Sequence, residues 1–85
     1  MILYGAREHY YIINNFVHIS SNVAIGGNVI INEGAHIGIG ASVIQGIEIG
    51  KWVTVGAGTV VIEDIPDYAI VLGCPGKIIK YNDPI

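Results

Sequence analysis

The sequence predicts an all-β fold, a parallel β-helix of six-residue repeats, and three patterns indicate it. Stepping by six from Ile13 to Val61 meets an aliphatic residue at all nine positions. The position four places after each of these is apolar in eight of nine cases, the exception being the small residue Thr59. The position three places after each is Gly or Asn in six of nine cases, and both residues tolerate the positive φ of a tight turn.

The period of six excludes the other regular architectures. A helical stripe recurs every three or four residues, and a meander of hairpins alternates strictly along longer strands. Here two inward positions flank one outward position before the chain turns, which makes strands of about three residues. Three such units close a triangular coil of 3 × 6 = 18 residues, and successive coils stack at about 4.8 Å.

The pattern divides the chain into three parts. Residues 1–12 form an irregular N-terminal segment or partial coil, since Met1 and Arg7 occupy inward positions. Residues 13–66 form the β-helix, with nine repeats in three coils. Residues 67–85 form a non-repetitive tail that we expect to pack on the helix. Trp52 replaces the turn Gly or Asn of the last coil, where it would cap a corner or cover an edge.

Composition excludes several classes of protein. The chain has 85 residues, enough for one small domain, and 52% hydrophobic with 13% charged residues argues against disorder. No run approaches 18 apolar residues, so we expect no membrane span. A net charge of −3 with four basic residues offers no footprint for nucleic acid.

The N-terminus and the single cysteine bear on location. Arg7, Glu8 and His9 interrupt the chain before an apolar region develops, so we expect no signal peptide and a cytoplasmic protein. Cys74 cannot form an internal disulfide, and we expect it to be a small buried filler.

Four segments of the chain resemble one family. They are Glu8-His9 through Phe16-Val17-His18-Ile19-Ser20, Gly27-Asn28-Val29, Val55-Gly56-Ala57-Gly58-Thr59-Val60-Val61, and the closing run from Val71 to Ile79 with Gly73-Cys74-Pro75-Gly76-Lys77. They resemble the hexapeptide-repeat acyltransferases, especially sugar acetyltransferases of the sialic-acid O-acetyltransferase and UDP-N-acetylbacillosamine N-acetyltransferase type. The resemblance covers nearly all of this chain but only the C-terminal half of such an enzyme.

The resemblance implies a left-handed coil, a homotrimer and acetyl transfer. The donor would be acetyl-CoA, with no metal expected, and the acceptor an amino or hydroxyl group of a sugar or nucleotide sugar. His9 matches the histidine that acts as general base, a role that suits an imidazole titrating near neutrality. The family places an acidic residue directly after this histidine, whereas this chain has Tyr10 there. Glu8 is therefore the candidate for orienting the base.

The same resemblance assigns the donor site. His18 would contact the acetyl end of acetyl-CoA, and the pantetheine arm would lie in a groove near Gly27, Ile39 and Ala57. Lys77 and Lys80 are candidate contacts for the phosphates of coenzyme A, because they are half of the basic residues and stand together in the tail.

The spacing of His9 and His18 favours shared sites. They are nine residues, or half a coil, apart, so on a rigid prism they project from different sides. They cooperate only if His9 of one subunit meets His18 of the next. Apolar residues at outward positions also favour a homotrimer with parallel axes; they are Ile30, Ile44, Val60 and Ile62.

Other interpretations stay open. His36 lies 18 residues after His18 and Thr54 a further 18, so this column is a structural ladder, a metal site or a lining of the donor groove. A metal lyase of the γ-carbonic-anhydrase type shares the β-helix and uses three histidines, but its close His-x-x-x-x-His pair is missing here. A further alternative is a non-catalytic trimerisation module or a truncated acetyltransferase domain.

Overall fold

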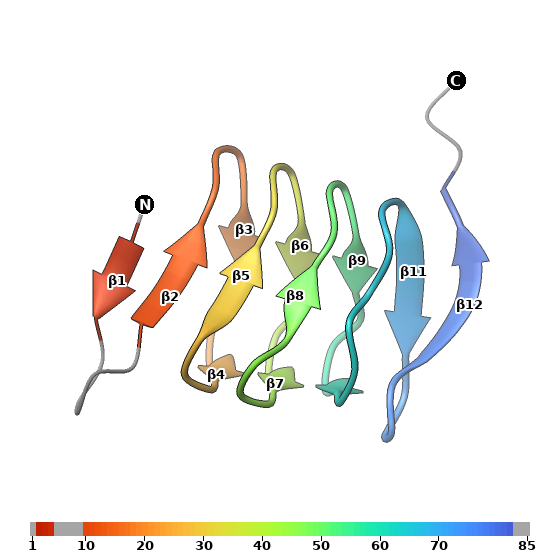
Figure 1. Cartoon of the computed structure of the whole chain (residues 1–85). Helices are drawn as coiled ribbons and strands as arrows, with labels where there is room; N and C mark the ends of the chain where they lie inside the picture. Colours follow the sequence, from red (N-terminus) through yellow and green to blue (C-terminus); the bar gives the residue numbers. More distant parts are fainter. Residues whose placement is uncertain (1, 5–9, 83–85) are drawn as a thin grey trace.

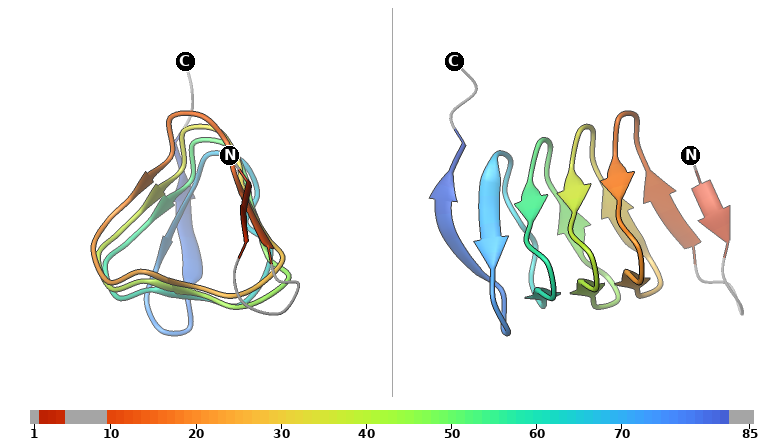
Figure 2. Two further views of the ribbon diagram at one scale, coloured as in Figure 1. Left: turned by 90° about the vertical axis from the view of Figure 1, so that its left-hand side faces the viewer. Right: turned by 180° about the vertical axis from the view of Figure 1, so that it is seen from behind.

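The chain folds into a triangular prism of short strands (Figures 1 and 2). A computed structural model describes residues 2–4 and 10–82, and all regular structure in them is β. The strands are β1 (Ile2–Tyr4), β2 (Tyr10–Ile13), β3 (His18–Ile19), β4 (Ala24–Ile25), β5 (Val29–Ile31), β6 (His36–Ile37), β7 (Ser42–Val43), β8 (Glu48–Ile49), β9 (Thr54–Val55), β10 (Val60–Val61), β11 (Ala69–Leu72) and β12 (Lys77–Tyr81).

The strands assemble into three sheets, which are the three faces of the prism. One sheet has the order β1-β2-β5-β8, the second β10-β7-β4 and the third β12-β11-β9-β6-β3. From β2 to β10 every pairing is parallel and joins residues 18 apart, as in the pairs Ile13 with Ile31 and Ile25 with Val43. The pairing of Tyr11 with Val29 extends this ladder before Ile13.

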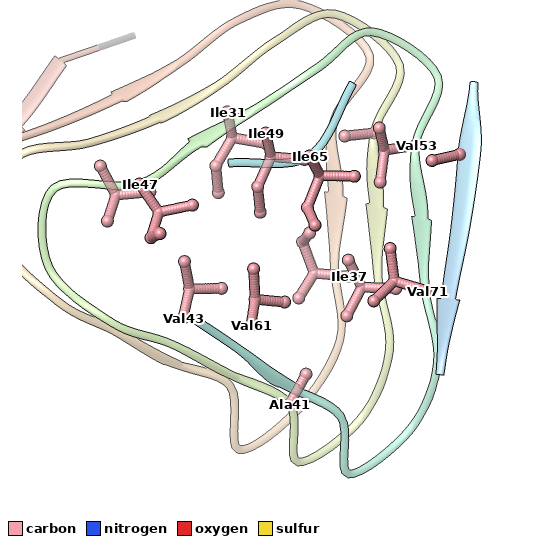
Figure 3. Packing of buried hydrophobic residues seen from close by; sticks show 14 residues of the cluster. Ile31, Ile37, Ala41, Val43, Ile47, Ile49, Val53, Val61, Ile65 and Val71 are labelled. Carbon is pink, nitrogen blue, oxygen red and sulfur yellow. The ribbon is translucent and has the colours of Figure 1, made fainter. Parts of the chain in front are cut away.

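The two inward columns form the core. Fourteen apolar residues between Val29 and Val71 are buried, and their side chains fill the inside of the prism (Figure 3). Ten of them are completely inaccessible, and Ile31, Ile37 and Ile49 have the largest side chains of these ten. The six-residue period therefore specifies the core, because each repeat places two side chains inside, one from each inward column.

The corners adopt the left-handed backbone conformation that the third column predicts. Phe16 has φ 63°, Trp52 has φ 56°, and the Gly and Asn residues of the column lie between 59° and 77°. Bulky side chains rarely adopt this conformation. Trp52 does so with its indole ring across Gly34, where a Cβ atom would overlap the ring. Trp52 thus covers the turn of the preceding coil.

The last coil is two residues shorter than the others. A strict period of 18 would place Ile65 in the column of Ile47, but Ile65 instead pairs with Ile49, 16 residues earlier. The shorter corner leaves the Glu48 N–H without a strand carbonyl, and this group donates to Asp64 Oδ1 at 2.9 Å. The expectation of nine equal repeats through residue 66 is wrong at this last corner.

Strand β11 continues the prism where a non-repetitive tail was expected. It pairs in parallel with β9, with Ile70 opposite Thr54 and Val71 opposite Val55. Strand β12 returns antiparallel to β11 and ends the sheet (Figure 1). The loop between β11 and β12 is hydrogen-bonded to β10. The Val60 N–H donates to Gly73 O, and the Val60 carbonyl accepts from the Gly76 N–H. Cys74 in this loop is exposed, so the expectation of a buried filler is wrong.

Candidate functional site

The outer surface of the five-stranded sheet carries one continuous column of side chains. The register pairs neighbouring strands residue by residue, and we call the resulting series the outer column: His18, His36, Thr54, Ile70 and Lys80. Paired residues on adjacent strands project from the same side of a sheet. Both histidines and the lysine are exposed, and the two residues between them are partly buried. The column thus crosses the whole face from β3 to β12.

Two imidazoles stack at the β3 end of the outer column. The ring centroids of His18 and His36 lie 4.7 Å apart, and the ring planes differ by 19°. This separation is typical of an offset aromatic stack. Stacked rings present their faces to each other, whereas metal ligands point ring nitrogens at a common centre. The pair therefore forms a ladder along the sheet and does not have the geometry of a metal chelate.

Both predicted tail lysines reach the outer face at the β12 end. Lys77 pairs with Leu72 and Lys80 with Ile70 on β11. Residues three apart on a regular strand project from opposite sides. Here the register shifts between Val71 and Ile70, so that Ile79 has no partner in the pairing. This bulge brings both ammonium groups to the side on which the histidines lie.

Ile39 and Ala57 lie together at the corner beside this face. Ile39 follows β6 and is 54% exposed, and Ala57 occupies the same place one coil later and is also exposed. The Gly58 N–H donates to Ile39 O at 2.8 Å. A Cβ on Gly38 would lie 2.7 Å from the Ala57 nitrogen, so the coils approach closely at this corner. The structure brings these two predicted groove residues next to the outer column.

Gly27 lies at a different corner. It falls between β4 and β5, and its carbonyl accepts a hydrogen bond from the Gly46 N–H at 2.9 Å. The three-stranded sheet separates this corner from the one with Ile39 and Ala57. A groove that includes all three therefore needs a second subunit. His9 and Glu8, the predicted base and its partner, lie outside the residues that the structure describes.

An acidic hollow of about 350 Å³ lies at the shortened last corner. Its lining includes Glu48, Asp64 and Asp67. The Asp64 carboxylate accepts the Glu48 backbone N–H, and the Asp67 carboxylate accepts the Lys51 backbone N–H.

Among the residues from 10 to 82 and 2 to 4, no group of three or more His, Cys, Asp or Glu side chains is arranged to hold a metal ion. In these same ranges no helix is long and apolar enough to cross a membrane.

The curated proteins that parts of this chain resemble in sequence include several acetyltransferases. No family model matches the chain. Serine acetyltransferase from Bacillus pumilus is 44% identical over 36 residues, 42% of this chain and 17% of that protein. The dTDP-3-amino-3,6-dideoxy-alpha-D-galactopyranose 3-N-acetyltransferase of Aneurinibacillus thermoaerophilus is 54% identical over 33 residues, 39% of this chain and 17% of that protein.

Solved structures extend the likeness over most of the chain. PerB from Caulobacter crescentus, in complex with CoA and GDP-perosamine, superposes with a TM-score of 0.81 and 38% identity over 82% of this chain and 34% of its own. The acetyltransferase domain of PglB from Neisseria gonorrhoeae, in complex with acetyl coenzyme A, gives 0.80 and 42% over 81% of this chain and 34% of its own.

The chain has the hexapeptide-repeat β-helix of these acetyltransferases. The predicted left-handed parallel β-helix is confirmed by this superposition. The chain spans about one sixth of the length of the curated relatives and about a third of most of the solved chains. Two features of the site are not predicted by the sequence: the stack of the His18 and His36 rings and the bulge at Ile79. The 18-residue spacing of His18 and His36 indicates that they are neighbours, but no pattern in the sequence indicates the bulge.

Proposed function

We propose that this chain is the acetyl-CoA-binding β-helix of an acetyltransferase whose acceptor is an amino or hydroxyl group of a sugar or nucleotide sugar. The observation that carries the proposal is the outer column, with imidazoles at one end and ammonium groups at the other. An acyl thioester needs polar contacts at its carbonyl, and the phosphates at the far end of coenzyme A need cations. The column offers both on one face.

The length of the outer column suits this ligand. His18 and Lys80 are four strand steps apart, which at about 4.8 Å a step is about 19 Å. The extended pantetheine arm has about 13 bonds from sulfur to phosphorus and reaches about 16 Å, because each bond of about 1.5 Å advances by less than its length. The two lengths agree within one strand spacing. Ile39 and Ala57 would flank the arm, since small and apolar groups allow a thin chain to lie close.

His9 would supply the proton transfer. As the acceptor nitrogen or oxygen bonds to the acyl carbon, His9 takes its proton, and the imidazolium returns a proton to the departing sulfur. Glu8 would orient His9. His18 and a backbone N–H near Gly27 would hold the carbonyl oxygen as it gains negative charge. Lys77 and Lys80 would hold the phosphates.

The site would be completed in a homotrimer. Half a coil separates His9 from His18, and Gly27 lies at a different corner from Ile39 and Ala57. A neighbouring subunit would place its His9 beside His18 and its Gly27 corner beside Ile39 and Ala57. A cytoplasmic location stays a prediction.

Two measurements test this function. Calorimetric titration of the chain with acetyl-CoA should show binding, and a thiol-release assay with a set of amino sugars should show turnover. His9→Ala should bind acetyl-CoA normally but lower turnover about 10²- to 10⁴-fold, which is the usual contribution of a general base. An unchanged rate in His9→Ala would remove the mechanism. Binding with no turnover on any acceptor would instead favour a non-catalytic trimerisation or binding module.

A further inference from the structure

His18 lies where the sheet restrains it least. Its strand, β3, has two residues and is the last strand of the five-stranded sheet. Only β6 pairs with it. In the described part of the chain, no hydrogen bond reaches the His18 ring, and the ring stacks on that of His36. A side chain on an edge strand has few neighbours to select one rotamer, so its orientation depends on that contact.

His36 is anchored much more firmly. Its strand, β6, lies between β3 and β9. The neighbouring residues Ala35 and Ile37 are completely buried, and the His36 N–H donates to Val53 O at 2.8 Å. The backbone under the His36 ring is therefore held from both sides, and the ring forms a fixed platform for the ring of His18.

We infer that His36 is a positioning residue, whose ring holds the imidazole of His18 in the outward orientation that the acyl end of the donor requires. The inference rests on the proposed function for its consequence, but its structural part concerns these two rings alone. His36 acts through a ring face, so an aromatic ring without nitrogens should replace it. An aliphatic side chain should not.

Two substitutions in the full chain separate stacking from other roles. His36→Ala removes the ring, His36→Phe keeps an aromatic face, and Asn15→Ala, at an exposed turn residue outside the outer column, is the control. Loss of the neighbouring ring current in His36→Ala should move the His18 ring protons downfield in NMR spectra of labelled protein. In His36→Phe these protons should stay shielded.

The same variants should differ in donor binding. Fixing one side chain on binding costs about 0.5–1.5 kcal/mol. Without the His36 ring this cost falls on the binding step, so His36→Ala should raise the Kd for acetyl-CoA about two- to tenfold. The donor KM should rise by a similar factor with a smaller change in kcat. His36→Phe and Asn15→Ala should both bind within twofold of the unsubstituted chain.

Two outcomes overturn the inference. Unchanged His18 resonances and an unchanged Kd in His36→Ala would show that the stack does not orient the His18 ring. A loss in His36→Phe equal to that in His36→Ala would show that the His36 nitrogens act directly on the donor. If the unsubstituted chain fails to bind acetyl-CoA, the proposed function fails, while the NMR comparison still decides whether His36 orients His18.

Discussion

Thr59 is a polar side chain at a position where other coils carry Val23 and Ala41. It is completely buried, and its Oγ1 has no hydrogen-bond partner in the described structure. A buried hydroxyl without a partner costs about 1–3 kcal/mol of desolvation. The methyl group of the same residue lies close to Gly76, where an added Cβ would come within 2.8 Å of it. The shape of the residue suits the site, and its polarity does not.

Thr59→Val should therefore raise the free energy of unfolding by about 1 kcal/mol, since it keeps the shape and removes the unpaired hydroxyl. Chemical denaturation followed by circular dichroism measures this as a higher midpoint with an unchanged slope. Thr59→Ser is the matched control. It keeps the hydroxyl but loses a buried methyl group, and should lower the free energy of unfolding by about 1 kcal/mol. A less stable Thr59→Val chain would mean that the hydroxyl has a partner.

At the scale of one element, the corner after β6 depends on the close approach of two coils. A Cβ on Gly38 would lie 2.7 Å from the Ala57 nitrogen and 2.8 Å from the Gly56 carbonyl carbon, both of which are backbone atoms. Gly40, two residues later, has open space around it and φ 71°. Asn22 occupies the same place one coil earlier at φ 59°.

Gly38→Ala should lower the free energy of unfolding by about 1–3 kcal/mol, because the coils must move apart to admit the methyl group. Gly40→Asn should change it by less than about 1 kcal/mol, since Asn tolerates this backbone conformation. Thermal unfolding of the two variants side by side makes the comparison. Equal losses would mean that backbone conformation, rather than the approach of the coils, limits this corner.

The bulge in β12 gives the lysines a testable role. Lys80→Ala should weaken acetyl-CoA binding about fivefold, which is the effect of losing about 1 kcal/mol at an exposed ion pair. Binding of S-acetyl-pantetheine, which carries no phosphate, should not change. Lys51→Ala removes another exposed lysine at a different corner and is the matched control. If Lys80→Ala weakens both ligands equally, the ammonium group does not contact the phosphates.

The sequence predicts the elements well as far as the period of 18 holds. Every parallel pairing from β2 to β10 follows from it, because two inward side chains per repeat leave no other register. The prediction fails after Val61, where the corner loses two residues. A signal for this was present: Ile65, Ala69 and Val71 repeat the spacing of Ile49, Val53 and Val55 with an offset of 16.

The candidate site was less accessible to prediction. The period alone places His36 above His18, but ring stacking depends on rotamers, which a period does not specify. The shared side of Lys77 and Lys80 depends on a bulge, and strand alternation would have put them on opposite sides. His9 and Glu8 rest on the resemblance alone.

At the scale of the whole molecule, the prism exposes apolar side chains on its corners. Ile39 is 54% exposed, Ile44 is 44% exposed and Ile62 is 45% exposed. Exposed apolar surface of this kind is typical of interaction sites. Sedimentation equilibrium at micromolar concentration should give about three times 9.0 kDa. A stable, folded monomer would contradict both the trimer and the shared site.

Mixed trimers test whether subunits share the site. Chains with His9→Ala and chains with His18→Ala should each be inactive. After joint unfolding and refolding, about a quarter of the sites would combine an intact His9 with an intact His18 from the neighbour, if the chains mix at random. Turnover should recover to that level. No recovery in mixtures that form trimers would mean that each chain uses its own pair of histidines.

The outer column has a consequence for how such a protein can change in evolution. Whole coils can be added to a β-helix without disturbing its inward columns, so packing does not select their number. Coils that precede β3 leave the span from His18 to Lys80 untouched, and their copy number is free to drift. A coil duplicated between β3 and β12 would lengthen that span by about 4.8 Å and separate the two ends of one ligand. The length of the bound molecule therefore constrains the number of coils between β3 and β12, and this number should stay constant as related proteins diverge.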